Sequence, residues 1–87
     1  MTTNDCEIQA LNYLTRREHS RLELERKLLV KGYAEEVIQS VLEKLNSKNL
    51  QSEERFAANY TKTRASRGYG PVRIALELRE RGVNDLD

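Results

Sequence analysis

The chain of 87 residues contains few of the residues that would indicate disulfide bonds or membrane segments. Its single cysteine, Cys6, excludes an intrachain disulfide and gives no sign of an oxidising compartment, so we expect a cytoplasmic protein. No apolar run approaches the ~18 residues that cross a bilayer, and no basic patch precedes an apolar segment at the amino terminus. We therefore expect neither export nor a membrane span.

Proline and glycine are also scarce, with one proline and four glycines, whereas 33% of the residues are charged. This composition is typical of short helices with extensive polar surface, and the length suits one small domain. The formal net charge is only +1, which argues against attraction to nucleic acid through bulk charge. We expect an all-α protein whose electrostatic function depends on local separation of charge.

That separation is clearest between Arg55 and Leu76, where five basic residues occur and no acidic residue does. Within this segment two glycines precede Pro71, which suits the first turn of a helix. We expect the positive side chains to converge on the free N–H groups at the start of that helix, and we predict a docking site for negative charge. The basic residues are Arg55, Lys62, Arg64, Arg67 and Arg73.

Apolar residues recur at helical spacing in five segments, and capping residues mark several of the starts. Ser20 and Glu23 form a capping box, and Ser52 is an N-cap. The expected apolar stripe of the first helix consists of Ile8, Ala10, Leu11 and Leu14. The expected helices are Glu7–Arg17, Ser20–Gly32, Glu35–Leu45, one that begins after Ser52, and Pro71–Gly82.

The sequence contains an internal repeat. Aligning Gly32 with Gly82 pairs residues of the preceding helices at an offset of 50, and an offset of 47 pairs residues of the helices before those. The pairs include Leu24 with Ile74, Leu28 with Leu78, Ala10 with Ala57, Tyr13 with Tyr60 and Arg17 with Arg64. We predict a complete three-helix repeat over residues 1–50. A second, incomplete repeat over residues 51–87 has two helices and the start of a third, which leaves one apolar face uncovered.

With these residues in place, the chain from Ala10 to Asp85 resembles the RecX regulatory family, whose members consist of tandem three-helix repeats. The order and spacing of several motifs carry the resemblance. They are Arg17-Glu18-His19-Ser20, Lys31-Gly32-Tyr33, Glu53-Glu54-Arg55-Phe56-Ala57, Arg67-Gly68-Tyr69-Gly70-Pro71 and Arg81-Gly82-Val83. Typical members have three repeats, so this chain is shorter by the last helix of the second repeat and all of the third.

The resemblance implies a non-enzymatic protein that binds the RecA recombinase filament in its helical groove and inhibits ATP hydrolysis and strand exchange. It thereby implies a role in DNA recombination, DNA repair and the SOS response. The residues themselves leave two other hypotheses open. One is a helical module that binds single-stranded nucleic acid directly. The other is an interaction module whose second repeat pairs with another copy through an apolar face of Phe56, Tyr60, Ile74 and Leu78.

The predicted binding site surrounds the glycine turn. Arg64 and Arg67 lie one helical turn apart and Arg73 is the third residue of the next helix, so all three could face a groove around Tyr69. No carboxylate in the segment is available to neutralise them, which favours binding of acidic side chains or phosphates. The alternative is a solvated face on which arginine stems cover apolar surface.

The predicted binding site includes further residues, some of which have an alternative role. Tyr69 could stack on a base or a partner, or fold back over the turn. Lys62 shares the basic segment, and Arg17 matches Arg64 in the repeat, although local ion pairs on a solvated surface also explain the basic cluster around Arg17. The predicted partner- and anion-binding residues are Arg64, Arg67, Tyr69, Arg73, Lys62 and Arg17.

No motif indicates catalysis. His19 precedes the cap Ser20 and is expected to frame the entry to a helix, and Cys6 has no second thiol or histidine nearby in the sequence. Tyr13, Tyr33 and Tyr60 are expected to pack against the core or its edge. We predict no catalytic residue, no cofactor and no metal site, and we expect that the chain is not an enzyme.

Overall fold

The computed structural model describes residues 2–84, which form five α-helices and no strand. The helices are α1 (Thr3–Arg16), α2 (Arg21–Val30), α3 (Glu35–Ser47), α4 (Glu53–Ser66) and α5 (Pro71–Glu80). The all-α prediction is confirmed. The predicted start of a third helix in the second repeat falls partly on residues 85–87, outside the described range. The predicted division after Leu50 stays a prediction.

The capping residues set the helix starts. Ser20 and Glu23 form the predicted capping box of α2, and the Ser52 side chain accepts a hydrogen bond from the backbone N–H of Arg55. The first helix begins four residues before its predicted start because Thr2 and Asp5 form a second capping box. Across the described residues, every helix falls short of the length and apolar character that a bilayer-crossing segment needs.

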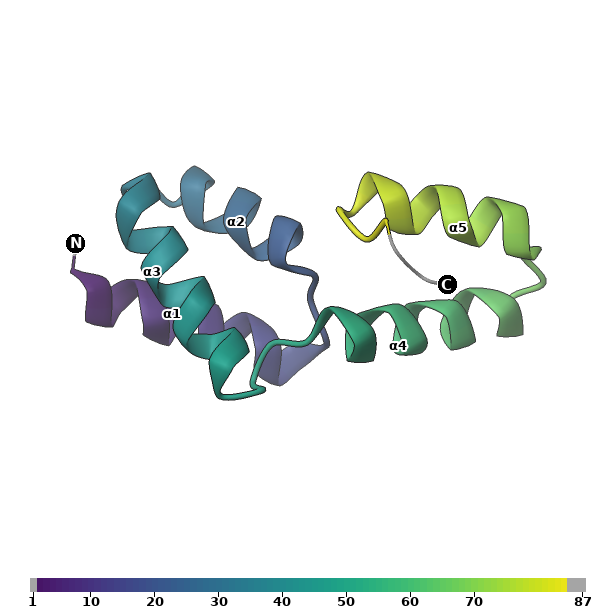
Figure 1. The fold of residues 1–87 in the computed structure, drawn as a ribbon, viewed down its shortest axis with the longest axis horizontal. Coiled ribbons are helices and arrows are strands. Elements are labelled where there is room, and N and C mark those ends of the chain that lie inside the picture. The colour runs from purple at the N-terminus through teal and green to yellow at the C-terminus, as the bar shows by residue number, and fades with distance from the viewer. Residues whose placement is uncertain (1, 85–87) are drawn as a thin grey trace.

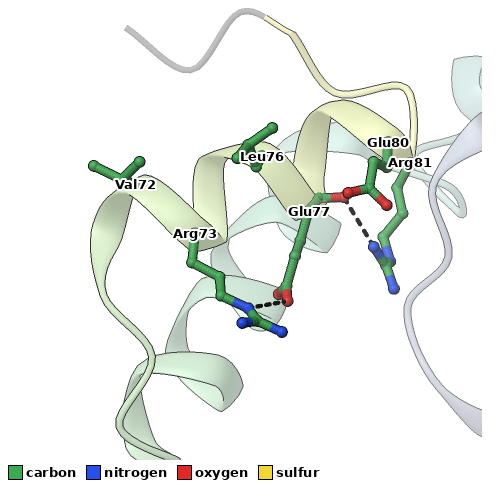
Figure 2. A pocket seen from close by; sticks show the side chains of 6 residues that line it. All are labelled: Val72, Arg73, Leu76, Glu77, Glu80 and Arg81. Carbon is green, nitrogen blue, oxygen red and sulfur yellow. Dashed lines mark hydrogen bonds and ion pairs between the residues drawn. The ribbon is translucent and has the colours of Figure 1, made fainter.

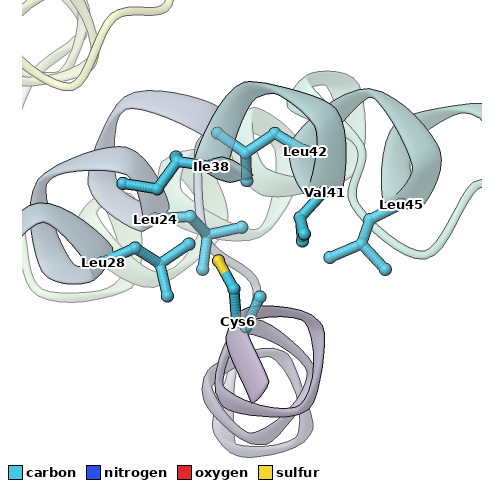
Figure 3. Packing of buried hydrophobic residues seen from close by; sticks show 8 residues of the cluster. Cys6, Leu24, Leu28, Ile38, Val41, Leu42 and Leu45 are labelled. Carbon is cyan, nitrogen blue, oxygen red and sulfur yellow. The ribbon is translucent and has the colours of Figure 1, made fainter. Parts of the chain in front are cut away.

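Helices α1–α3 enclose the larger core. Leucines of α2 and α3 point toward Cys6 of α1 in Figure 3, and the buried thiol fills the space between the three helices. Ile8 is 49% exposed, so the predicted stripe of α1 is wrong at this residue. Ala10 is buried as predicted, Leu11 and Leu14 are partly buried against the core, and Cys6 completes the buried face. The buried residues are Cys6, Ala10, Leu24, Leu28, Ile38, Val41, Leu42 and Leu45.

Helices α4 and α5 form an antiparallel hairpin around a smaller core of Phe56, Ala57, Ile74, Leu78 and Val83. Because Phe56 is 2% exposed and lies inside the hairpin, it does not contribute to the open apolar face predicted for self-association, whereas Ile74 and Leu78 of that predicted face line a groove. An apolar groove of about 360 Å³ does run along the hairpin, lined by Thr61, Ala65, Tyr69, Pro71, Ile74, Ala75 and Leu78. Self-association through this groove stays a prediction.

Helices α1 and α2 form a hairpin like that of α4 and α5, and the two hairpins follow one another along the long axis of the molecule, which measures 42 × 22 × 19 Å. Figure 1 shows that α4 extends away from the end of α1, and that the end of α5 lies beside the start of α2. The hairpins α1–α2 and α4–α5 thus repeat in space in the order in which they repeat in the sequence.

The contact between the repeats involves Gly82 and Leu22. Gly82 has a φ of +85°, and a Cβ atom placed on it would lie 2.9 Å from the Cβ of Leu22. Ion pairs flank this contact, with Arg81 Nε 3.7 Å from Glu23 Oε2 and Arg55 Nε 2.8 Å from Glu18 Oε2. Gly82 therefore serves both the turn after α5 and the close approach of the two repeats.

Buried polar groups complete the junction. The Gln51 side chain, 1% exposed, donates hydrogen bonds to the His19 carbonyl and to Glu53 Oε1. The same Glu53 oxygen accepts from the backbone N–H of Arg21 at 2.8 Å, so a residue of the second repeat caps the start of α2. These bonds join the repeats through groups that would be costly to bury unpaired.

His19 is almost completely buried next to the start of α2, which confirms its predicted structural position. Its Nδ1 lies 3.1 Å from the Arg17 carbonyl and its Nε2 lies 2.8 Å from Lys27 Nζ. Since a carbonyl only accepts and an ammonium only donates, Nδ1 carries the proton and the ring is neutral. Burial lowers the pKa of His19, and also that of Lys27.

The junction yields a test with a matched control. Gly68 has a φ of +91° but open space around it, so Gly68→Ala should lower the free energy of unfolding by about 1 kcal/mol through backbone strain. Gly82→Ala should add a packing cost of roughly 1–3 kcal/mol, because its methyl group meets Leu22. Urea unfolding of both variants measures the difference. Equal losses would show that Gly82 does not set the spacing of the repeats.

Candidate partner-binding groove

A groove of about 300 Å³, here called the inter-repeat groove, lies where the two hairpins meet. Four arginines and two glutamates contribute to its walls, so positive charge is in excess. The first repeat and the second both supply charged groups. The lining residues are Arg17, Glu18, Glu23, Phe56, Asn59, Tyr60, Thr63, Arg64, Arg67 and Arg81.

The structure thus brings Arg17, Arg64 and Arg67 of the predicted site into one groove. Arg73 and Tyr69 lie next to Arg64 but are not among the groove's lining residues. Lys62 is exposed on α4 and is also absent from the lining. The predicted site is therefore divided between the groove, a neighbouring cluster around Tyr69, and the separate Lys62.

The expectation that no carboxylate neutralises these arginines was wrong. Glu77 accepts hydrogen bonds from Arg64 Nε and Nη2, both at 2.8 Å, and from Arg73 Nε at 3.2 Å. The sequence segment without acidic residues ends just before Glu77. Because α5 folds back along α4, Glu77 returns to Arg64, thirteen residues earlier.

Tyr69 lies between two guanidinium groups. The centre of its ring is 3.7 Å from Arg64 Cζ and 5.0 Å from Arg73 Cζ, and the ring packs against the smaller core. The tyrosine therefore folds back over the turn, as one of the two sequence alternatives predicted. Its ring positions both arginines by cation–π contact.

Glu23 forms a second set of ion pairs in the inter-repeat groove. Its Oε1 lies 3.0 Å from Nη1 of Arg17, which belongs to the same repeat. Its Oε2 lies 3.7 Å from Nε of Arg81, which belongs to the second repeat. Arg81 also stacks over the ring of Tyr60 at 4.7 Å. Local ion pairing, the alternative weighed for Arg17, is thus present alongside its place in the groove.

Two basic residues of the predicted site keep their charge available. Neither Arg67 nor Lys62 lies within ion-pair distance of a carboxylate among residues 2–84, and both are exposed. Of these two, only Arg67 belongs to the groove. Arg67 is therefore the residue of the predicted site best placed to meet an external anion.

The adjoining surface of α5 combines charge with exposed apolar side chains. Figure 2 shows Arg73 and Arg81 on either side of Glu77, with Arg73 paired to its carboxylate and Arg81 bonded to its backbone carbonyl. Val72 and Leu76 line the same pocket as Arg73 and Glu77 and are 78% and 50% exposed, and in Figure 2 their side chains point away from the Glu77 carboxylate. This surface offers apolar area beside the charged groups, as protein interfaces commonly do.

The hydrogen bonds around Glu77 shift the pKa values of the groups involved. Arg64 above all, together with Tyr60 and Arg73, holds the pKa of Glu77 at about 2, against an ordinary value of 4.5. The Glu77 carboxylate in turn raises the pKa of Arg64. Burial and the hydrogen bond to Glu77 raise the pKa of Tyr60. Glu77 is thus ionised throughout the physiological range.

The sequence did not predict that Tyr60, Glu77 and Arg81 contribute polar groups to this surface. The ion pair of Arg73 with Glu77 could have been predicted, because the two residues lie four positions apart on one helix. The contacts of Glu77 with Tyr60 and Arg64 could not, because they depend on how α5 packs along α4.

No arrangement suited to metal binding occurs in the described part of the chain, where no group of three or more His, Cys, Asp or Glu side chains could hold an ion. The Cys6 thiol is buried, and burial raises its pKa, which disfavours the reactive thiolate. The charged and aromatic side chains of this surface are suited to recognition through charge and stacking.

This geometry defines the chain as an all-α tandem helical repeat protein with a charged groove at the junction of its repeats. Family models agree with that description over nearly the whole chain: the first three-helix domain of RecX matches residues 8–45 and the second matches residues 52–86. The chain belongs to the RecX family.

Curated relatives support the same assignment. Regulatory protein RecX of Halorhodospira halophila is 50% identical over 76 residues, which cover 87% of this chain and 47% of the relative. Its counterpart in Pseudomonas fluorescens SBW25 is 44% identical over 78 residues, 90% of this chain and 50% of the relative. That of Mannheimia succiniciproducens is 46% identical over 71 residues, 82% of this chain and 46% of the relative. The chain spans about half the length of these relatives.

The Glu77 contacts predict how stability depends on pH. Because the pKa of Glu77 is about 2 in the folded protein and 4.5 ordinarily, the unfolded chain binds more protons between these values. The stabilisation by Glu77 is therefore present above pH 4.5 and is lost as the pH falls toward 2. Urea unfolding of the wild type and Glu77→Gln should show a stability difference that shrinks over this range. A difference that does not change with pH would contradict the assignment.

Proposed function

We propose that this chain binds the RecA recombinase filament and inhibits its ATPase and strand-exchange activities, and so affects recombination and DNA repair. Membership of the RecX family of regulatory proteins supports a regulatory role, and the family resemblance supplies RecA as the partner. The chain acts by binding, without transforming a substrate or using a cofactor. Since it spans about half of its relatives, inhibition by this length of chain is part of the proposal.

The inter-repeat groove is the observation that carries the proposal. Its walls combine arginines with a smaller number of glutamates, and its aromatic and arginine side chains are those that dominate protein interfaces. Arg67 provides the available charge, while Arg17 and Arg64 are fixed by Glu23 and Glu77. A rigid, mixed-charge surface suits a protein assembly that presents discrete acidic side chains.

The overall charge favours a nucleoprotein partner over bare nucleic acid. A net charge of +1 gives little attraction to a continuous row of phosphates, and Glu18 and Glu23 within the groove would repel them. On the filament, by contrast, the protein subunits supply most of the surface that the groove meets. Contact with DNA is then secondary to contact with RecA.

Arg67→Glu tests the proposal, with Lys62→Glu as the matched control. Both changes reverse one exposed positive charge, Lys62 within α4 and Arg67 at its C-cap, but only Arg67 lines the groove. We expect Arg67→Glu to weaken binding to RecA filaments on single-stranded DNA about tenfold, because a charged contact at an interface is replaced by repulsion. Lys62→Glu should stay within about twofold of the wild type. Fluorescence anisotropy of the labelled protein measures both, and equal effects would refute the groove as the site.

The same two variants, titrated against bare single-stranded DNA at two salt concentrations, examine the alternative function. A direct nucleic-acid binder would bind naked strands with an affinity that falls steeply with salt and that both charge reversals reduce. Binding to the filament with little binding to bare DNA is the outcome expected for a RecA regulator.

A further inference from the structure

Four hydrogen-bond donors surround the carboxylate of Glu77, in an arrangement that resembles a binding site for a carboxylate. Tyr60 Oη and Arg64 Nε donate to Oε1 at 2.9 and 2.8 Å, while Arg64 Nη2 and Arg73 Nε donate to Oε2 at 2.8 and 3.2 Å. Both oxygens of one planar group are thus bound, and Arg64 binds both of them. We call Tyr60, Arg64 and Arg73 the carboxylate cradle.

The arginines of the cradle do not depend on Glu77 alone for their positions. Tyr69 lies between Arg64 and Arg73 and contacts both guanidinium groups through its ring. The phenolic group of Tyr60 belongs to a ring that packs on the smaller core. If the Glu77 side chain moved away, these contacts would still hold the donors near one another, and the cradle would be preorganised for another carboxylate.

The internal repeat indicates that a carboxylate at this position is not needed for the fold. With the offset of 50 that aligns α2 with α5, Glu77 corresponds to Lys27. In the first repeat Arg17, the counterpart of Arg64, is bound by Glu23 one turn earlier on α2. The same pair of helices therefore packs with a lysine where the second repeat has Glu77.

The cradle is also accessible. The side chain of Arg73 is 64% exposed, and that of Glu77 retains 14% exposure although it is surrounded by donors. In Figure 2 the Arg73 guanidinium lies at the open side of the Glu77 carboxylate, while Val72 and Leu76 point away from it. An incoming acidic side chain would thus approach past Arg73, the most exposed donor.

We propose that the carboxylate cradle is an exchange site, filled by Glu77 in the free protein and by an acidic side chain of the polypeptide partner in the complex. The planar, two-oxygen geometry fits a carboxylate, and the glutamates of the adjoining groove disfavour a chain of phosphates. This inference rests on the proposed function, because the partner is the protein of the filament. Glu77 then lowers the affinity for that partner, since its own carboxylate must leave first.

Glu77→Gln tests the exchange because it keeps the shape of the side chain and removes its charge. Hexaglutamate serves as the probe, and the Arg64 Nε–H resonance in NMR reports occupation of the cradle. We expect Glu77→Gln to bind hexaglutamate about fivefold more tightly than the wild type, the effect of losing one partly exposed competing ion pair. Glu36→Gln, an exposed change on α3 with the same effect on net charge, should bind as the wild type does.

Each other outcome overturns the proposal. Weaker binding by Glu77→Gln would show that Glu77 positions the arginines for the partner. An equal gain in affinity for hexaglutamate in both variants would show that only the net charge matters. If Glu77→Gln gained more affinity for hexathymidylate than for hexaglutamate, the ligand of the cradle would be phosphate.

A second pair of variants keeps the test valid if Glu77→Gln fails to fold by circular dichroism. Arg73→Gln removes only the most exposed donor and leaves the Arg64–Glu77 pair in place, whereas Arg79→Gln removes an exposed arginine elsewhere on α5. We expect Arg73→Gln to weaken hexaglutamate binding about threefold and Arg79→Gln to leave it unchanged. Equal effects of these two variants would refute the cradle.

The peptide experiment separates this inference from the proposed function. If hexaglutamate occupies the cradle but RecA filaments do not bind, the exchange site stands and the partner is wrong. If filaments bind through Arg67 and Glu77→Gln changes neither filament nor peptide binding, the proposed function stands and the exchange is wrong.

Discussion

The close contact of Gly82 with Leu22 is the constraint on which the rest of the surface depends. It sets how near the second repeat comes to the first, and that distance allows Arg81 to reach Glu23. The inter-repeat groove exists because charged side chains of both repeats face each other across this junction. A glycine with a positive φ thus links the turn after α5 to the geometry of the groove.

Charge on this surface is balanced locally, and the balance determines what the surface can bind. Glu23 and Glu77 pair with four arginines and hold them in defined orientations, whereas Arg67 has no carboxylate partner among residues 2–84. Fixed guanidinium groups give directional recognition at the expense of long-range attraction. Such a surface discriminates among partners by the placement of individual acidic groups more than by their number.

Local signals in the sequence predicted most of the fold. Ser20 with Glu23, Ser52 and Pro71 fixed helix starts because capping involves residues only a few positions apart. The site was predicted less well, because the pairing of Arg64 with Glu77 depends on the return of α5 along α4. Tyr69 was left between two alternatives for the same reason, since its contacts with Arg64 and Arg73 come from both helices.

The spatial repetition of the hairpins along the long axis has a consequence for longer members of the family. Arg17 and Arg64 hold matching positions and both line the groove, so a further unit with arginine at the same position would extend the row. Contacts arranged in a row on one chain engage a periodic assembly with an effective concentration that rises with every unit. Avidity, and not the strength of any one contact, would then scale with the number of repeats.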